Sequence, residues 1–121
     1  MGKKGFIDIH AHGIYEPGYP GFRTGAPGSE SGQPLCSPEE LTAHYDRLGI
    51  AKGCILPIVW PESFSTINTQ SNEEILRFCQ THPDRFIPFC NVDPRACFNS
   101  TETPFARILT WYRERGFKGV G

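Results

Sequence analysis

The sequence lacks long apolar runs, an excess of charge of one sign and paired cysteine motifs. No stretch approaches the roughly 20 apolar residues of a membrane span, and Asp8 and His10 interrupt the apolar core that a signal peptide would need near the start. With 12 Lys and Arg against 13 Asp and Glu, the formal net charge is only −1. We therefore expect neither a nucleic acid nor a membrane as a partner.

The five cysteines form no CxxC motif, and their number is odd. This usage is typical of free thiols in a reducing compartment, so we expect a cytoplasmic protein. Cys54 and Cys90 lie inside apolar runs, where a free cysteine behaves as a small apolar residue. We expect both side chains to lie in the core.

Glycine and proline are unevenly placed in the chain. Residues 13–37 hold six of the 13 glycines and four of the 11 prolines, and we expect this segment to be a long loop after the first strand. Long loops in compact domains are often functional. We therefore interpret residues 13–37 as a lid over a substrate, with a surface excursion as the alternative.

After this loop, amphipathic and apolar segments alternate. Helices are expected over 37–49, 71–82 and 103–116, and strands over 52–60, 85–92 and from 118 onward. Serine caps, with glutamate three residues later, are expected at Ser37 and Ser71, and Thr103 precedes a proline that suits the first helical turn. The apolar stripes expected to pack in the core are Leu41, Tyr45 and Leu48; Ile75, Leu76, Cys79 and His82; and Phe105, Ile108, Leu109 and Tyr112.

The spacing of these segments predicts a fold class. Successive strands start roughly 33 residues apart, which is the length of one strand–helix unit. A helix between two strands returns the chain to the same end of the sheet, so the strands are expected to be parallel in an α/β fold. No hairpin turn signal lies between the strands, which disfavours the antiparallel α+β alternative.

The segment FIDIHAHG, residues 6–13, carries the clearest chemical signal. Asp8, His10 and His12 occupy alternate positions, which is the period of a strand, so we expect all three side chains on one face. Two imidazoles that point the same way at a strand end have the form of half of a metal site.

Other polar residues follow the later strands. Trp60 ends the second predicted strand, Asn91 and Asp93 end the third, and Arg95 follows directly. Because the carboxyl ends of parallel strands carry the site in α/β folds, we expect these residues to converge with the two histidines.

Three segments together resemble a known family. IDIHAH on a first strand resembles the HxH signature of the amidohydrolase superfamily, HPDRFIPFCNVDPR (82–95) resembles a segment of the family-2 amidohydrolases, and RGFKGVG (115–121) resembles the stretch that leads into their fourth strand. That branch includes the aminocarboxymuconate-semialdehyde decarboxylase-like enzymes. The resemblance implies a (β/α)8 TIM barrel with a divalent metal, usually zinc, at the carboxyl ends of the strands.

By this resemblance, His10 and His12 are the metal ligands of strand 1, and neutral imidazole suits zinc. Asp8 is expected to fix a histidine tautomer by a hydrogen bond behind the metal. Arg23 and Arg95 are candidates to bind a substrate carboxylate, because guanidinium matches carboxylate geometry. Trp60, Asn91 and Asp93 complete the expected substrate-binding residues.

The family's remaining metal ligands and its catalytic acid–base residue have no counterpart in the sequence. His44 and His82 lie in expected helices, which form the outer ring of such a barrel. A (β/α)8 barrel needs about 250 residues, so residues 1–121 are expected to be one incomplete domain: about three strand–helix units and the start of a fourth strand. The catalytic residues are expected beyond Gly121.

Several functional interpretations stay open. The leading one is a metal-dependent enzyme that hydrolyses an amide or lactone, or decarboxylates a small carboxylic acid without oxidation. The alternatives are a catalytically inert half-barrel and a PHP-type metal phosphoesterase, whose first strand also carries HxH. The sequence is compatible with a homodimer.

Overall fold

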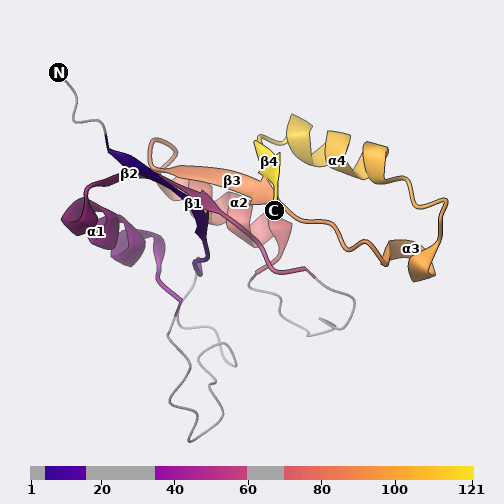
Figure 1. Ribbon diagram of the computed structural model, residues 1–121, viewed down its shortest axis with the longest axis horizontal. Helices are drawn as coiled ribbons and strands as arrows, with labels where there is room; N and C mark the ends of the chain where they lie inside the picture. Colours follow the sequence, from indigo (N-terminus) through magenta and orange to yellow (C-terminus); the bar gives the residue numbers. More distant parts are fainter. Residues whose placement is uncertain (1–4, 16–34, 60–69) are drawn as a thin grey trace, which may run out of the picture.

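The computed structural model describes residues 5–15, 35–59 and 70–121, and within them strands and helices alternate along the chain (Figure 1). The elements are β1 (Phe6–Ala11), α1 (Pro38–Leu48), β2 (Ile50–Ile55), α2 (Asn72–Thr81), β3 (Phe86–Cys90), α3 (Ala96–Asn99), α4 (Phe105–Glu114) and β4 (Gly119–Val120). The four strands pair in the order β1-β2-β3-β4, and every pairing is parallel. The predicted α/β class is confirmed, and the strands form a curled half-barrel with the helices between them.

Helix α1 begins as the sequence predicts. The Ser37 hydroxyl accepts a hydrogen bond from the Glu40 backbone, and the Glu40 carboxylate accepts one from the Ser37 backbone, so both halves of a capping box are present. Gly49 ends the helix with φ of 72°, a left-handed conformation that glycine adopts without steric cost. Leu41 and Tyr45 are buried as predicted, but Leu48 is 67% exposed because it lies in the last turn, away from the core.

Helix α2 packs on the same face of the sheet. Ser71 caps it by accepting from the Glu74 backbone, and the buried side chains are those of Ile75, Phe78 and Cys79. Phe78, which lies outside the predicted apolar stripe, is 0% exposed, and its ring centroid lies 4.9 Å from that of Phe86. The core lies between the sheet and helices α1 and α2; its buried members are Leu41, Tyr45, Ile55, Ile75, Phe78, Cys79 and Phe86.

The segment before β4 differs from the prediction in two ways. A short helix, α3, precedes α4, and its residues Cys97 and Phe98 have positive φ values. Thr103 does not cap α4, because its hydroxyl donates to the backbone carbonyls of Ala96 and Ser100 within the α3 turn. Helix α4 therefore begins at Phe105, without a side-chain cap.

The predicted apolar stripe of α4 is not buried. None of its residues reaches full burial, although Phe105, Ile108, Leu109 and Tyr112 are partly covered. Helix α4 lies beside β4 at one end of the sheet (Figure 1).

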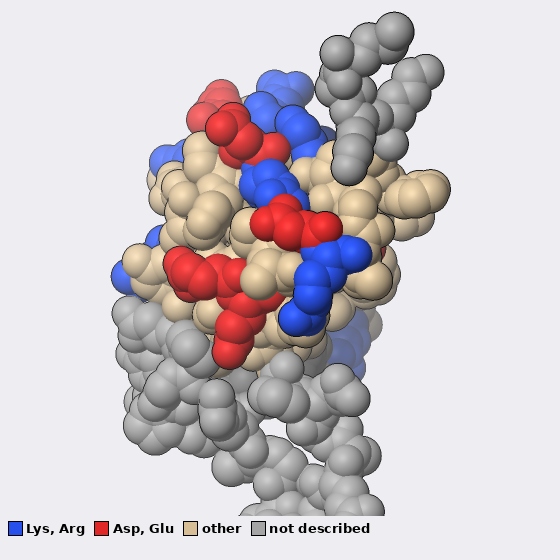
Figure 2. Space-filling view, turned by 90° about the vertical axis from the view of Figure 1, so that its left-hand side faces the viewer, with Lys and Arg blue, Asp and Glu red and all other residues tan. Residues whose placement is uncertain are grey.

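Arg85 joins three elements at the amino ends of the strands. Its guanidinium donates to the backbone carbonyls of Ile50 and Ala51 at the start of β2, and to the carboxylate of Asp46 on α1. Acidic and basic side chains are interspersed on the side of the molecule shown in Figure 2. No helix in the described ranges is long and apolar enough to cross a membrane.

Strand β1 lies at one end of the sheet and exposes apolar side chains. Phe6, Ile7 and Ile9 are all exposed, and Ile7 retains 57% of its surface. The opposite end of the sheet is β4. The sheet thus presents an apolar face and two end strands, as expected for part of a barrel. Cys54 and Cys90 are buried as predicted, and all five cysteines are free thiols.

Candidate metal centre

The face to which each residue of β1 points is set by a bulge. Asp8 pairs with Gly53 of β2, while Ala11 pairs with Ile55, so three residues of β1 span the same distance as two of β2. Ala11 packs against the helix-side core. Because His10 and His12 flank Ala11, their side chains point to the opposite, inner face of the sheet.

Asp8 therefore does not share the face of the histidines, and that prediction is wrong. Its Oδ2 accepts a hydrogen bond from the Tyr45 hydroxyl of α1 at 3.0 Å, on the helix side. Its Oδ1 accepts from the backbone N–H of His10, also at 3.0 Å. The extra residue in β1 shifts by one position the alternation of side chains between the two faces of the sheet. The spacing of residues in the sequence does not reveal such a shift.

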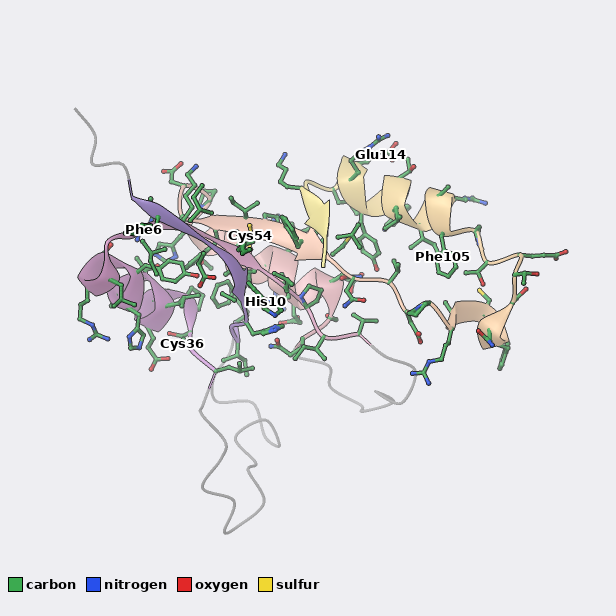
Figure 3. All side chains as sticks on the ribbon, in the orientation of Figure 1. Phe6, His10, Cys36, Cys54, Phe105 and Glu114 are labelled. Atoms are coloured by element: carbon green, nitrogen blue, oxygen red, sulfur yellow. The ribbon has the colours of Figure 1, made fainter. Side chains whose placement is uncertain are left out.

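The two imidazoles meet at the carboxyl end of β1. The Nε2 atoms of His10 and His12 lie 3.1 Å apart, and the rings meet edge to face. Figure 3 shows His10 at the end of β1. His12 Nδ1 lies 2.8 Å from the carbonyl oxygen of Leu56. A carbonyl oxygen only accepts, so Nδ1 carries the hydrogen and donates it, which leaves the Nε2 lone pair of His12 facing His10.

This donor set fits a divalent metal such as zinc. Two nitrogens at roughly 2.0–2.1 Å from one tetrahedral ion lie about 3.3 Å apart, close to the observed 3.1 Å between the Nε2 atoms. Metal-bound histidines commonly donate their other ring N–H to a carbonyl, as His12 does to Leu56. Within the described ranges, no group of three His, Cys, Asp or Glu side chains could hold a metal ion.

The other two histidines lie elsewhere, as predicted. His44 is exposed on α1, with its ring against Arg47. His82 ends α2, and its ring packs edge to face on Phe86 with the centroids 5.7 Å apart. Both belong to the helix layer.

Asn91, Asp93 and Arg95 follow β3 at the same, carboxyl edge of the sheet as the two histidines. The Asp93 carboxylate accepts from the backbone N–H of Arg95 at 2.9 Å, and the Arg95 Nε lies 3.7 Å away from it. Arg95 is exposed and Asp93 is mostly covered. The structure therefore pairs the candidate arginine with an acid of its own segment.

The backbone of Asn91 is held by a residue that sequence reasoning missed. Asn72, the first residue of α2, donates through Nδ2 to the Asn91 carbonyl at 2.9 Å and accepts through Oδ1 from the Asn91 N–H at 2.8 Å. The side chain of Asn72 is buried. The sequence signal that could have identified Asn72 is its position directly after Ser71, the predicted helix cap.

Arg23 and Trp60 lie outside the described residues, as does most of the predicted lid. The two ends of the 13–37 segment are described, and they meet. Gly13 pairs with Cys36, and the Ile14 N–H donates to the Cys36 carbonyl at 2.9 Å. Gly13 also lies against Phe78, where an added Cβ would come within 2.4 Å of the ring.

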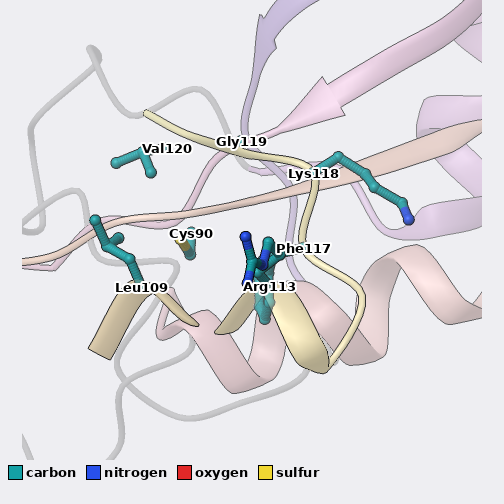
Figure 4. A pocket seen from close by; sticks show the side chains of 7 residues that line it. All are labelled: Cys90, Leu109, Arg113, Phe117, Lys118, Gly119 and Val120. Carbon is teal, nitrogen blue, oxygen red and sulfur yellow. The ribbon is translucent and has the colours of Figure 1, made fainter. Parts of the chain in front are cut away.

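Three hollows in the described part of the chain lie away from the histidines, and one of them, of 400 Å³, lies along α4 and is lined by Pro104, Arg107, Ile108, Trp111 and Tyr112. The one in Figure 4 has a volume of 190 Å³ and lies between β3, β4 and α4, lined by Cys90, Leu109, Arg113, Phe117, Lys118, Gly119 and Val120. The third, of 360 Å³, lies between α2, β3 and the end of α4. The hollow in Figure 4 is smaller than the roughly 300–1,000 Å³ typical of ligand pockets, and none of the three is lined by His10 or His12.

Comparison with known proteins gives one structural neighbour. No protein-family model matches the sequence, and no curated protein matches it. The fold is similar to the crystal structure of a probable 2-pyrone-4,6-dicarboxylic acid hydrolase from Acinetobacter baumannii with citric acid bound, with a TM-score of 0.52 and 18% sequence identity. The match covers 96% of this chain but only 36% of the neighbour, so the likeness establishes the fold of a partial TIM barrel.

Proposed function

We propose that this chain supplies His10 and His12 as two ligands of a divalent metal centre, with zinc as the expected ion, in a hydrolase of the amidohydrolase type. The observation that carries the proposal is the ring pair, with Nε2 atoms 3.1 Å apart and the His12 tautomer set by the Leu56 carbonyl. A catalytic zinc takes three protein ligands, so the proposal requires at least one more from outside the described residues.

The proposed substrate class is a small amide or lactone that carries carboxylate groups. The structural neighbour is a probable hydrolase of a pyrone dicarboxylic acid, and a 2-pyrone ring is a cyclic ester. Arg95 at the carboxyl edge, with Arg23 of the preceding loop, supplies guanidinium groups of the kind that bind carboxylates. Asn91 and Asp93 follow the same strand, and Trp60 follows β2 in the sequence as the proposed pocket wall.

The chemistry divides between the ion and the chain. When bound, a divalent metal acidifies water and polarises a carbonyl group. The chain contributes two imidazoles whose Nε2 atoms lie 3.1 Å apart, and the Leu56 carbonyl keeps the His12 ring in the tautomer that binds through Nε2. In hydrolysis, water adds to the carbonyl carbon, the carbon–oxygen or carbon–nitrogen bond breaks, and the leaving atom takes up a proton.

Metal titration tests the site directly. The metal-free chain is titrated with Zn²⁺ against a chromophoric chelator, and with Co²⁺ followed by its visible spectrum. We expect His10→Ala and His12→Ala each to weaken metal binding at least about 100-fold. Removing a group that only hydrogen-bonds to a metal ligand costs roughly 10–100-fold in affinity, and removing the ligand itself costs more. The control His44→Ala, on the exposed side of α1, is expected to bind as the unchanged chain does.

Equal metal affinity in the unchanged chain and the two ligand variants would contradict the proposal. Product analysis then assigns the reaction. Ring-opened acid from a lactone dicarboxylate supports the hydrolase, and CO2 release assigns the decarboxylase branch instead. Phosphate from a model ester assigns a phosphoesterase, and no product from any of these assigns an inert half-barrel.

A further inference from the structure

We propose that Tyr45 and Asp8 form a positioning pair that turns the two histidines to the inner face of the sheet and thereby sets the affinity of the metal centre. The inference rests on the proposed metal site and adds to it a residue from the helix layer. It assigns to Tyr45, a side chain of α1 in the packed core, a role in the arrangement of ligands on β1.

The bulge in β1 is what the pair holds. In a regular strand His10 would point to the same side as Asp8, toward α1, because side chains two apart share a face. The structure instead has Asp8 opposite Gly53 and Ala11 opposite Ile55, with one additional residue between them on β1. Loss of this bulge would direct the His10 ring toward the helix layer and separate it from a site on the inner face.

The two oxygens of the Asp8 carboxylate accept hydrogen bonds from the bulge and from α1. Oδ1 accepts from the His10 backbone N–H at 3.0 Å, an amide within the stretch where the β1–β2 register is interrupted. Oδ2 accepts from the Tyr45 hydroxyl at 3.0 Å. Hydrogen bonds to an ionised carboxylate are roughly twice as strong as neutral ones, so Asp8 is tied at one end to the backbone of a ligand and at the other to α1.

The position of the Tyr45 hydroxyl is itself fixed. Tyr45 is 2% exposed, and its ring packs edge to face on Phe86 with the centroids 6.2 Å apart. Gly53 leaves the space that the ring occupies, since an added Cβ there would lie 2.1 Å from the hydroxyl oxygen. The glycine of β2, the tyrosine of α1 and the aspartate of β1 therefore fit together as one unit.

The test removes the hydroxyl and keeps the ring. In Tyr45→Phe we expect the dissociation constants for Zn²⁺ and Co²⁺ to rise about 10-fold, the lower end of the range for groups behind metal ligands. We also expect an altered Co²⁺ visible spectrum, because the two nitrogens no longer face the ion in the same way. In the metal-free protein, hydrogen exchange at the His10 amide is expected to accelerate about 10-fold.

Tyr112→Phe is the matched control. Its hydroxyl also donates from a helix to a carboxylate, that of Glu73 at 3.1 Å, but it lies on α4, which lies beside β4 at the end of the sheet opposite β1 (Figure 1). We expect this variant to keep the affinity, the spectrum and the His10 exchange rate of the unchanged chain. Asp8→Asn, which keeps one acceptor oxygen, is expected to fall between Tyr45→Phe and the unchanged chain in exchange at His10.

The two proposals fail in different ways. If the unchanged chain binds no metal, the proposed function is wrong, while His10 exchange still reports on the bulge. If Tyr45→Phe and Asp8→Asn both bind metal and protect the His10 amide as the unchanged chain does, the positioning pair is overturned and the metal site stands. If Tyr45→Phe does not fold, Asp8→Asn alone decides by the same two measurements.

Discussion

At the scale of the residue, the buried thiol of Cys79 makes the stability of the fold depend on pH. This α2 thiol is 3% exposed, and burial, with a smaller contribution from Cys54, raises its pKa from 9.0 to about 12. In the unfolded chain the thiol ionises near pH 9, while the folded chain keeps it neutral. Its contribution to stability is therefore complete below pH 9 and is lost as the pH rises toward 12.

We predict that the free energy of unfolding falls with a slope approaching about 1.4 kcal/mol per pH unit above pH 9 from this thiol. Urea unfolding at pH 8 to 10.5 measures the slope, and Cys79→Ala is expected to reduce it. Cys97→Ala, at an exposed cysteine of α3, is expected to leave the slope unchanged. Identical slopes in all three proteins would contradict the prediction. Burial and the Asp8 carboxylate also raise the pKa of Tyr45, and this contributes equally to the slope in the unchanged chain, Cys79→Ala and Cys97→Ala.

The candidate site shows what single residues do and do not reveal in a sequence. The pairing of His10 with His12 followed from their spacing, and the structure brings their Nε2 atoms to 3.1 Å. The carbonyl of Leu56, which sets the His12 tautomer, is a backbone group and has no sequence signature. The bulge after Asp8 was hidden for a related reason, since a register depends on the partner strand as well as on the strand itself.

At the scale of the element, local signals placed the first helices well. The caps at Ser37 and Ser71 are short-range features, and both appear as predicted. The third helix was expected to begin at Thr103, but the Thr103 hydroxyl donates to the carbonyls of Ala96 and Ser100 in the turn of α3, a helix that the sequence pattern did not predict. Burial of the α4 stripe depends on packing against residues distant in the sequence. The periodicity therefore predicted more burial of this stripe than the described residues have.

Arg85 provides a test of how the elements are held together. Its guanidinium donates to the carbonyls of Ile50 and Ala51 at 3.1 and 2.9 Å, in addition to the Asp46 carboxylate at 2.8 Å. A lysine has no planar fork and cannot make these bonds together. We predict that Arg85→Lys lowers the free energy of unfolding by about 1–3 kcal/mol, measured by urea unfolding.

The matched control for this variant is Asp46→Asn. The Asp46 side chain is 63% exposed, and exposed ion pairs contribute roughly 0–1 kcal/mol. We therefore expect a loss below about 1 kcal/mol, because the backbone bonds of Arg85 remain. An equal loss in both variants would show that the ion pair, rather than the backbone contacts, dominates.

At the scale of the whole molecule, the sheet has two ends and an apolar inner face. β1 and β4 are the end strands, and Ile7 and Ile9 of β1 are exposed. The chain spans 36% of the length of the structural neighbour. Exposed strand edges with apolar side chains favour pairing with further strands.

We predict that the 121-residue chain associates with itself in a concentration-dependent way, measured by sedimentation velocity. Ile7→Lys places a charge on the end strand, as natural edge strands often do, and is expected to weaken association about 10-fold. Leu48→Lys removes a similar exposed apolar side chain from α1 and is expected to have no effect. Equal association of Ile7→Lys and the unchanged chain would contradict an edge-driven contact.

The closed base of the 13–37 segment has a consequence for engineering. The Ile14 N–H and the Cys36 carbonyl bridge its two ends directly after His12, so the chain returns to its starting point before α1 begins. Because closing a longer loop costs only about 0.6 kcal/mol per doubling of length, we expect the chain to tolerate changes of length between Ile14 and Cys36. Grafted sequences of other lengths are expected to leave β1, α1 and the two histidines in place, so the length of this segment could be varied in a library without redesign of the sheet.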